Sequence, residues 1–474
     1  MKRWSLALVA LALALGGCPG TVPEGALSDG SLGDWGLYFR DGGPTPGTDA
    51  PLADGRPPRG DAARADGTGR ADGAGRDAPS PLVDGRPAAD RALGDAGCAC
   101  VIGGKCFAPG EADPTNTCNR CDPARSVVLW TASAVPGCVL TLAGTGGPGS
   151  NDGAAAGASF NMPTAVAVDA SGAVLVADWG NHRVRRVAGG QVTIFAGTSQ
   201  GYADGASTSA AKLNWPWGVD VDDAGDVYVG DSTNHRVRVT RAGTTSTLAG
   251  SGAPGFLDEA WGQAQFNYPR GLAVWRNAGK VELFVADAIN HRVRRVAWDA
   301  TIISYRVTTY AGSGVRGLAN GPGASAQFDA PTDVAVATDG TVYVADTGNH
   351  LIRSIAPGGA TATWAGVGPG FADGDALTQT RFSSPTGVAI KRGAGSSLEL
   401  VIADQGNNRV RRAQLDTGTQ RYRVSTLAGG SVAGSADGPV AQARFAAPTG
   451  VAIDANGRIV VADRDNHRIR LVVP

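Results

Sequence analysis

The chain has 474 residues, which allows two to four domains, and its 42% of hydrophobic residues permits at least one substantial core. Its 70 glycines, roughly twice the usual share, and its 27 prolines argue against a mainly helical protein and favour turn-rich β structure or long flexible segments. A net charge of -1 disfavours the strongly basic surface of a nucleic-acid-binding protein, so no nucleic-acid partner is expected.

The first 17 residues have the layout of a secretory signal peptide. Lys2 and Arg3 precede an apolar run at residues 6–15, too short to span a bilayer, which ends in small residues before Cys18. The string Leu-Gly-Gly-Cys that ends at Cys18 resembles the bacterial lipobox, in which the cysteine becomes the lipid-modified first residue. This resemblance implies an exported lipoprotein anchored through Cys18, at the outer membrane or cell surface. The alternative is an ordinary cleaved signal with an unrelated cysteine.

A linker is predicted for residues 18–97. Residues 19–97 contain 17 glycines and 10 prolines, and such a segment cannot bury enough apolar surface to offset the entropy lost on ordering. We therefore expect a disordered, lipid-anchored linker, rich in Gly, Pro, Asp and Arg, that lets the folded part stand clear of a membrane.

Residues 98–138 form a cysteine-rich module. Its Cys-x-Cys and Cys-x-x-Cys spacings could suggest zinc, but export places the thiols in an oxidising compartment and the first histidine of the chain is His182. Disulfides are therefore favoured, and assigning Cys18 to lipid leaves an even number of cysteines to pair. The connectivity is left open among Cys98, Cys100, Cys106, Cys118, Cys121 and Cys138.

An internal repeat dominates residues 139–474. Its clearest block reads Val-Ala-Asp-x-x-Asn-His-Arg-Val-Arg-Arg-Val, with intervals of 53 to 59 residues between copies. Upstream of each block lie a Leu-Ala-Gly-like strand end and then a segment similar to Pro-x-Gly-Val-Ala-Val-Asp. The blocks are anchored by Asp178, Asp231, Asp287, Asp346, Asp404 and Asp463.

Each repeat contains four short β runs, in the first copy residues 166–169, 174–178, 182–187 and 192–196. Six such units predict an all-β fold, a six-bladed β-propeller with four-stranded blades. The last block lacks the strand that follows every other copy, whereas residues 139–144 supply one with no preceding block. We expect this N-terminal strand to complete the final blade, close the ring and place Cys138 beside that blade.

The blocks resemble NHL repeats, named after an Asn-His-Leu signature. The sequence has Asn-His-Arg in four copies, Asn-His-Leu at residues 349–351 and Asn-Asn-Arg at residues 407–409. The resemblance covers residues 139–474 and implies a propeller of a family that includes lyases, RNA-binding domains and surface sensors. Fold alone does not choose among these functions.

All five histidines share one repeat position, and Asn408 fills it in the remaining copy. A residue needed once per blade is expected to be structural, so each histidine should hydrogen-bond within its own blade, to the preceding aspartate. The arginines that follow should be balanced by the aspartates of the repeat, with Arg183 and Arg185 on one strand face and Val184 on the other.

No catalytic residues are predicted, because no histidine is left over and no nucleophile-base signature is present. The first strands carry Ala or Gly at most pore-facing positions, and the departures are Asp220 and Asp333. These carboxylates would be able to bind calcium, and with such a pore metal the protein would be a lyase or lactonase type of enzyme. Without it, no cofactor is expected.

Function is expected where the repeat loses its symmetry. Four copies have threonine after the repeat proline, but two adjacent copies have Trp217 and Arg270, preceded across that proline by Trp215 and Tyr268. With Trp179 from the neighbouring blade, these exposed aromatics and arginine would bind a protein, peptide or glycan. We therefore predict a monomeric, non-catalytic binding scaffold; the alternative interpretation of the patch is packing variation in loops.

Overall fold

The computed structural model of this chain describes residues 100–102, 105–121, 131–132, 135–277, 279–391 and 398–474. The predicted signal peptide, the Cys18 lipidation site, the linker and Cys98 lie outside these residues. In the part of the chain that is described, no helix is both long and apolar enough to cross a membrane.

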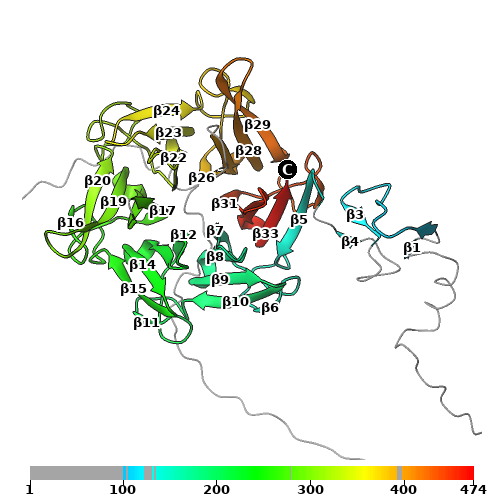
Figure 1. Ribbon diagram of the computed structural model, residues 1–474, viewed down its shortest axis with the longest axis horizontal. Coiled ribbons are helices and arrows are strands. Elements are labelled where there is room, and N and C mark those ends of the chain that lie inside the picture. Colours follow the sequence, from blue (N-terminus) through cyan, green and yellow to red (C-terminus); the bar gives the residue numbers. More distant parts are fainter. Residues whose placement is uncertain (1–99, 103–104, 122–130, 133–134, 278, 392–397) are drawn as a thin grey trace, which may run out of the picture. The chain divides into compact units, whose positions relative to one another are not determined.

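Six antiparallel sheets surround a central channel (Figure 1), which confirms the six-bladed propeller. In each sheet the first strand lies innermost and later strands follow outwards. Blade 1 contains β7 (Pro163–Val168), β8 (Val174–Asp178), β9 (Arg183–Ala188) and β10 (Gln191–Ala196), and blade 2 contains β12 (Pro216–Val221), β13 (Val227–Asp231), β14 (Arg236–Arg241) and β15 (Thr244–Ala249).

The remaining blades follow the same order. Blade 3 contains β17 (Pro269–Asn277), β18 (Lys280–Asp287), β19 (Arg292–Asp299) and β20 (Ser304–Ala311), and blade 4 contains β21 (Asp333–Val336), β22 (Val342–Asp346), β23 (Leu351–Ile355) and β24 (Thr361–Ala365). Blade 5 contains β26 (Pro385–Ile390), β27 (Glu399–Asp404), β28 (Arg409–Asp416) and β29 (Arg421–Gly429), and blade 6 contains β31 (Pro448–Ile453), β32 (Ile459–Asp463), β33 (Arg468–Val473) and β5 (Cys138–Ala143).

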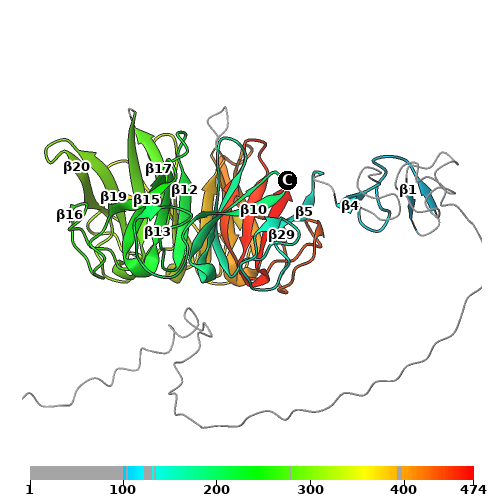
Figure 2. The ribbon, with the colours of Figure 1, turned by 90° about the horizontal axis from the view of Figure 1, so that it is seen from below.

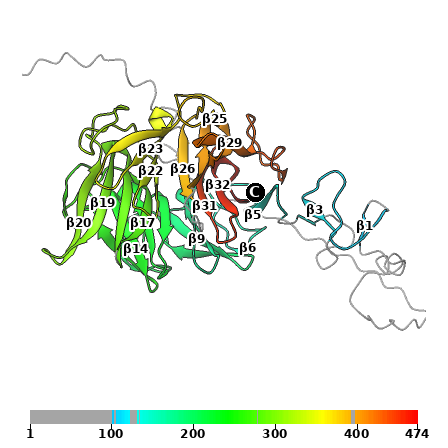
Figure 3. The ribbon, with the colours of Figure 1, turned by 45° about the horizontal axis from the view of Figure 1, so that its top comes forward.

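The predicted closure of the ring is confirmed. Strand β5 pairs with β33, Val472 opposite Val139 and Val473 opposite Cys138, so the N-terminal strand becomes the fourth strand of the last blade. Figure 3 shows β5 in the same blade as β31 and β32, and in the sheet β33 separates it from them. The fully buried Val139 lies in one apolar cluster with Val461 and Val472, and this packing joins the two ends of the repeat region.

A short outer strand extends five of the six sheets, which the sequence pattern did not predict. It is only two residues long in each case and pairs with the fourth strand. The five are β6 (Gly153–Ala154), β11 (Gly205–Ala206), β16 (Glu259–Ala260), β25 (Gly374–Asp375) and β30 (Gly438–Pro439). Such short pairs are below the length at which alternation is visible in a sequence.

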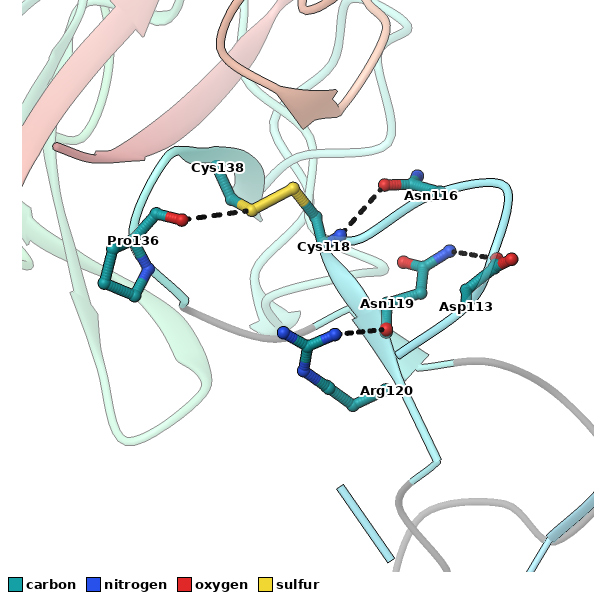
Figure 4. The surroundings of a disulfide bond; sticks show 7 residues. All are labelled: Asp113, Asn116, Cys118, Asn119, Arg120, Pro136 and Cys138. Carbon is teal, nitrogen blue, oxygen red and sulfur yellow. Dashed lines mark hydrogen bonds between the residues drawn. A yellow bond between two sulfur atoms is a disulfide. The ribbon is translucent and has the colours of Figure 1, made fainter. Parts of the chain in front are cut away.

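The cysteine-rich module is covalently joined to the propeller. A disulfide links Cys118 to Cys138, the first residue of β5, with an S–S distance of 2.01 Å (Figure 4). Cys121 is also disulfide-bonded. The module contains two small hairpins, β1 (Cys100–Ile102) with β2 (Lys105–Phe107) and β3 (Asn119–Arg120) with β4 (Thr131–Ala132). The prediction that Cys138 lies beside the last blade is therefore confirmed.

Each blade buries one arginine against carboxylates. In blade 1, Arg185 is fully buried on β9 and its Nη1 donates to Asp178 at 3.0 Å, while its Nε and Nη2 reach Asp152 in the preceding loop. The expectation that the aspartates of the repeat balance the arginines is confirmed for the Arg185 position, whereas Arg183 donates to the backbone carbonyl of Thr198. The equivalent arginines are Arg238, Arg294, Arg353, Arg411 and Arg470.

The repeat histidines connect neighbouring blades, so the prediction that each bonds within its own blade was wrong. His182 Nδ1 accepts a hydrogen bond from the backbone N–H of Trp215, which opens blade 2, and His467 accepts from Met162 of blade 1. Asn408 does the same with its side-chain oxygen at 3.0 Å. These residues adopt a left-handed backbone conformation, with φ of 56° at His182, which turns the side chain away from its own aspartate.

These histidine contacts predict a pH-dependent stability. Burial lowers the pKa of all five histidines below the ordinary value of 6.5, because removal from water disfavours the charged imidazolium. The contribution of the neutral histidines to the free energy of unfolding should be fully present above pH 6.5, the ordinary pKa in the unfolded chain. It should be lost as the pH drops through the lowered folded-state pKa values. We expect a loss of roughly 5 °C in melting temperature between pH 7 and pH 5.

Replacing all five histidines with asparagine, the residue that blade 5 already uses, should remove most of this pH dependence. Thermal melting of parent and variant at matched pH values measures the effect. An equal decline in the melting temperature of both proteins would contradict the conclusion that the histidines cause the pH dependence.

Candidate functional site

One face of the propeller carries all six short 3-10 turns and is called here the turn face. The first strand of each blade begins at this face and the second ends there, because Pro163 on β7 pairs with Asp178 on β8. The turns are η2 (Trp179–Asn181), η3 (Ser232–Asn234), η4 (Ala288–Asn290), η5 (Thr347–Asn349), η6 (Gln405–Asn407) and η7 (Arg464–Asn466). In blade 1, Asn181 holds its turn by donating to Asp178 and to the carbonyl of Gly149.

A ring of buried threonines borders the channel at the turn face. Each donates from Oγ1 to a backbone carbonyl of the next blade at 2.8 to 3.2 Å. The threonines are Thr164, Thr332, Thr386 and Thr449. Blades 2 and 3 have Trp217 and Arg270 at this position instead, and in blade 2 Ser232 on η3 replaces the missing contact by donating to the carbonyl of Pro269 at 2.6 Å.

The predicted patch residues do come together, in two pairs. The ring centroids of Trp179 and Trp215 are 4.5 Å apart, and the Arg270 guanidinium lies 4.5 Å from the Trp217 ring centroid. Tyr268 packs edge-on against His235, with 5.0 Å between ring centroids. Trp179, Trp215, Trp217, Tyr268 and Arg270 are called the aromatic patch below.

The structure corrects the expected exposure of this patch. Its four aromatic residues are half-buried and Arg270 is only 8% exposed. The close approach of the blades explains this burial, since Trp217 and Arg270 stand at the channel border where the other blades place small buried threonines. Arg270 is therefore packed into the border of the channel. The four half-buried aromatic residues provide the surface of the patch that a ligand can reach.

The two predicted pore carboxylates do line the channel, which encloses about 350 Å³ and is walled mainly by Val, Ala and Gly. Asp220 on β12 accepts the backbone N–H of Val274 in blade 3 at 2.8 Å, and Asp333 on β21 accepts that of Val388 in blade 5 at 3.0 Å. Each carboxylate therefore links its blade to the next. Asp333 takes the strand position that Gly387 and Gly450 fill in blades 5 and 6, two residues from the level of Asp220.

Asp333 is held in an unfavourable setting for a charge. Burial in the apolar channel, with the negative charge of Asp220 as a further contribution, raises the pKa of Asp333 to about 7. Among the residues that the structure describes, no three His, Cys, Asp or Glu side chains form a group that could hold a metal ion. The pair offers two carboxylates that each already accept a backbone N–H, so it does not by itself form a metal centre.

A row of exposed apolar side chains was missed by sequence reasoning. Tyr202, Phe256, Leu318 and Phe371 occupy equivalent loop positions in blades 2 to 5 and are 43 to 64% exposed. Arg236 lies 3.8 Å from the ring centroid of Tyr202, and Arg292 and Arg409 cover Phe256 and Phe371 similarly. The sequence did contain a signal for this row. In these four blades a large apolar residue stands two positions before the Asp or Asn that contacts the buried arginine, whereas blades 1 and 6 have serine there.

The pKa of Asp333 predicts a stabilising substitution. A carboxyl whose pKa is raised from 3.8 to about 7 destabilises the folded state as the pH rises through that interval. Asp333→Asn keeps an oxygen for the Val388 N–H and carries no charge. We expect it to raise the free energy of unfolding by about 1 kcal/mol at pH 8 and to have little effect at pH 4, as measured by urea denaturation. A destabilised variant at pH 8 would contradict the proposed charge penalty.

Comparison with known proteins places the repeats in a family. The model of the NHL repeat matches residues 160–187, 213–239, 328–353 and 445–470, which fall in blades 1, 2, 4 and 6. The chain is 32% identical over 242 residues to Protein SUPPRESSOR OF QUENCHING 1, chloroplastic, of Arabidopsis thaliana, and 27% identical over 301 residues to NHL repeat-containing protein 2 of Homo sapiens. These matches cover 48% and 56% of this chain but only 22% and 40% of the relatives.

Solved structures share the fold at low sequence identity. An auxiliary nutrient binding protein from Bacteroides thetaiotaomicron aligns with a TM-score of 0.53 at 16% identity, and a protein of unknown function from the same organism aligns with a TM-score of 0.52 at 21% identity. Each alignment covers 70% of this chain and 75% of the other. These likenesses agree with the observed fold, and the repeat matches within six closed blades identify the chain as an NHL-repeat protein with a six-bladed β-propeller.

Proposed function

We propose that this protein is a surface-exposed lipoprotein whose propeller is a non-catalytic binding scaffold, with the aromatic patch on the turn face as its ligand site. The observation that carries the proposal is the loss of symmetry at the channel border. Trp217 and Arg270 stand where the other four blades have threonine, and the large aromatics Trp215 and Tyr268 precede them across the repeat proline. Trp215 stacks with Trp179, and Trp217 packs against Arg270.

The chemistry of the patch supports a ligand with flat or apolar faces and hydrogen-bonding groups. Half-buried tryptophans combine a large apolar surface with an N–H donor and lose little conformational entropy on binding. A glycan or a peptide is such a ligand. The fold neighbour described as an auxiliary nutrient binding protein supports a binding role at the level of the fold alone.

The test exchanges the patch for residues that the repeat already uses. Ser232 and Ala330 stand where Trp179 and Trp215 do, and Thr332 stands where Trp217 does. We therefore expect the triple variant Trp179→Ser, Trp215→Ala, Trp217→Thr to fold. Binding to a glycan and peptide array, or to cell-wall preparations, should fall at least about tenfold, because the aromatic contact area is removed.

Trp298→Ala is the matched control, because Trp298 is 44% exposed and lies at the far end of blade 3 from the patch. It should retain parental binding. Arg270 is left in place because its burial makes its removal a test of stability. Unchanged ligand binding by a folded triple variant would remove the patch from consideration.

The alternative is a propeller enzyme with a metal held at Asp220 and Asp333. Its support is the position of both carboxylates in one channel. Metal analysis of the purified protein distinguishes the two functions, since about one tightly held calcium or zinc per chain that is lost in Asp220→Asn would favour the enzyme. On the scaffold proposal, the parent and the variant should contain the same background metal.

A further inference from the structure

An apolar hairpin tip extends blade 3 at the face opposite the turn face. Strands β19 and β20 are eight residues long, and the tip between them contains Ile302 and Ile303, which are 37% and 78% exposed. Behind the Asp299–Ser304 pair that follows the tip, Trp298 packs edge-on against Tyr305, with 5.6 Å between ring centroids, and Trp298 is 44% exposed. Figure 2 shows β19 and β20 at the outer edge of the propeller.

We propose that this tip, called here the blade 3 finger and defined as Trp298, Ile302, Ile303 and Tyr305, inserts into the interfacial layer of a lipid bilayer. The order of its side chains matches that environment. Aliphatic residues occupy the end of the hairpin, and aromatic residues follow at the depth where their mixed polar and apolar character is favoured.

The charges around the finger are compatible with insertion. Asp299 lies opposite Ser304, between the tip and the Trp298–Tyr305 pair, and is bonded to Arg306 at 2.7 Å. Asp299 also accepts hydrogen bonds from the N–H and hydroxyl of Thr301, which fixes the turn. Glu259 lies 3.7 Å from Arg306 on the same edge. The tip itself, residues 300–303, carries no charged side chain, so entry into the interface would bury no unpaired charge.

The hairpin of blade 5 shows that the fold does not require this apolar tip. Asp416 occupies the place of Asp299 and accepts the N–H of Gly418, and residues 417–420 are Thr, Gly, Thr and Gln. Gln420 and Ile303 share the same left-handed backbone, with φ of 55° and 52°. A β-branched residue is strongly disfavoured in that conformation, so isoleucine stands there against the local backbone preference.

A bilayer fits the finger better than a second protein molecule. A standard protein interface buries roughly 800 Å² on each partner, which four partly exposed side chains at one hairpin do not supply. A membrane interface accepts a small apolar tip without a complementary surface.

The location of the finger on the propeller is consistent with contact to a bilayer. Cys138 pairs with Val473 at the end of β33 farthest from the turn face, so the chain enters β5 at the same face that carries the finger. This step rests on the proposed lipid anchor upstream of β5. An anchored propeller would then present the finger to the membrane and the aromatic patch to the surroundings.

The test uses the chain with Cys18→Ala and without residues 2–17, so that neither an acyl chain nor the apolar run of the predicted signal peptide contributes to binding. Flotation with vesicles of phosphatidylethanolamine and phosphatidylglycerol, at low and high salt, measures partitioning. We expect salt-resistant binding that falls at least about tenfold in Ile302→Thr with Ile303→Gln, the residues of the blade 5 hairpin. The control Thr419→Ser with Gln420→Asn should bind like the parent, and melting temperatures verify folding.

Several results would overturn the proposal that the blade 3 finger inserts into a bilayer. These are the absence of vesicle binding by the Cys18→Ala chain, equal binding by the finger variant, and a parent dimer in sedimentation that the finger variant abolishes. The proposed function is tested separately, because the patch variant should lose array binding and retain vesicle binding. Mass spectrometry of the natively exported chain reports the Cys18 lipid independently of both results.

Discussion

The buried ion pair between arginine and aspartate in each blade is the interaction on which the rest of the propeller depends. The aspartate that ends each second strand accepts a hydrogen bond, through one oxygen, from a backbone N–H just before the first strand. In blade 1, Asp178 accepts from Asn161 at 2.7 Å. Its other oxygen receives the turn asparagine and the buried arginine. Breaking a buried pair leaves an uncompensated charge, which is costly, so strand, turn and loop are ordered together.

The same motif links one blade to the next. The turn that the aspartate stabilises ends on a left-handed residue, and that residue directs histidine or asparagine to a backbone N–H of the neighbouring blade. Threonine hydroxyls at the channel border add a second set of links. Both histidines and threonines act across the final junction as well, between blades 6 and 1, where β5 completes the sheet. Ring closure is therefore built from the same histidine and threonine contacts that follow blades 1 and 4.

Because the scaffold is repeated, departures from the repeat separate the candidate sites from it. The pore carboxylates replace Ala or Gly in the channel, and Trp217 and Arg270 of the aromatic patch replace threonine at the turn face, whereas the blade 3 finger alters the opposite face. Asp220 and Asp333 show why a departure alone does not define a site. Each carboxylate also serves as a link to the next blade, so its charge is tied to the scaffold.

The sequence by itself determined the number of blades, the four main strands of each blade and the closing segment. Each depends on local patterns that recur in register, and a missing strand at one end matched a surplus strand at the other. It also determined that Trp215, Trp217, Tyr268 and Arg270 break that pattern. Only the tertiary structure decided the histidine partners, which lie on the neighbouring blade, and the burial of Arg270 against Trp217. Those features depend on how adjacent blades approach each other in space, and spacing along one chain does not contain that distance.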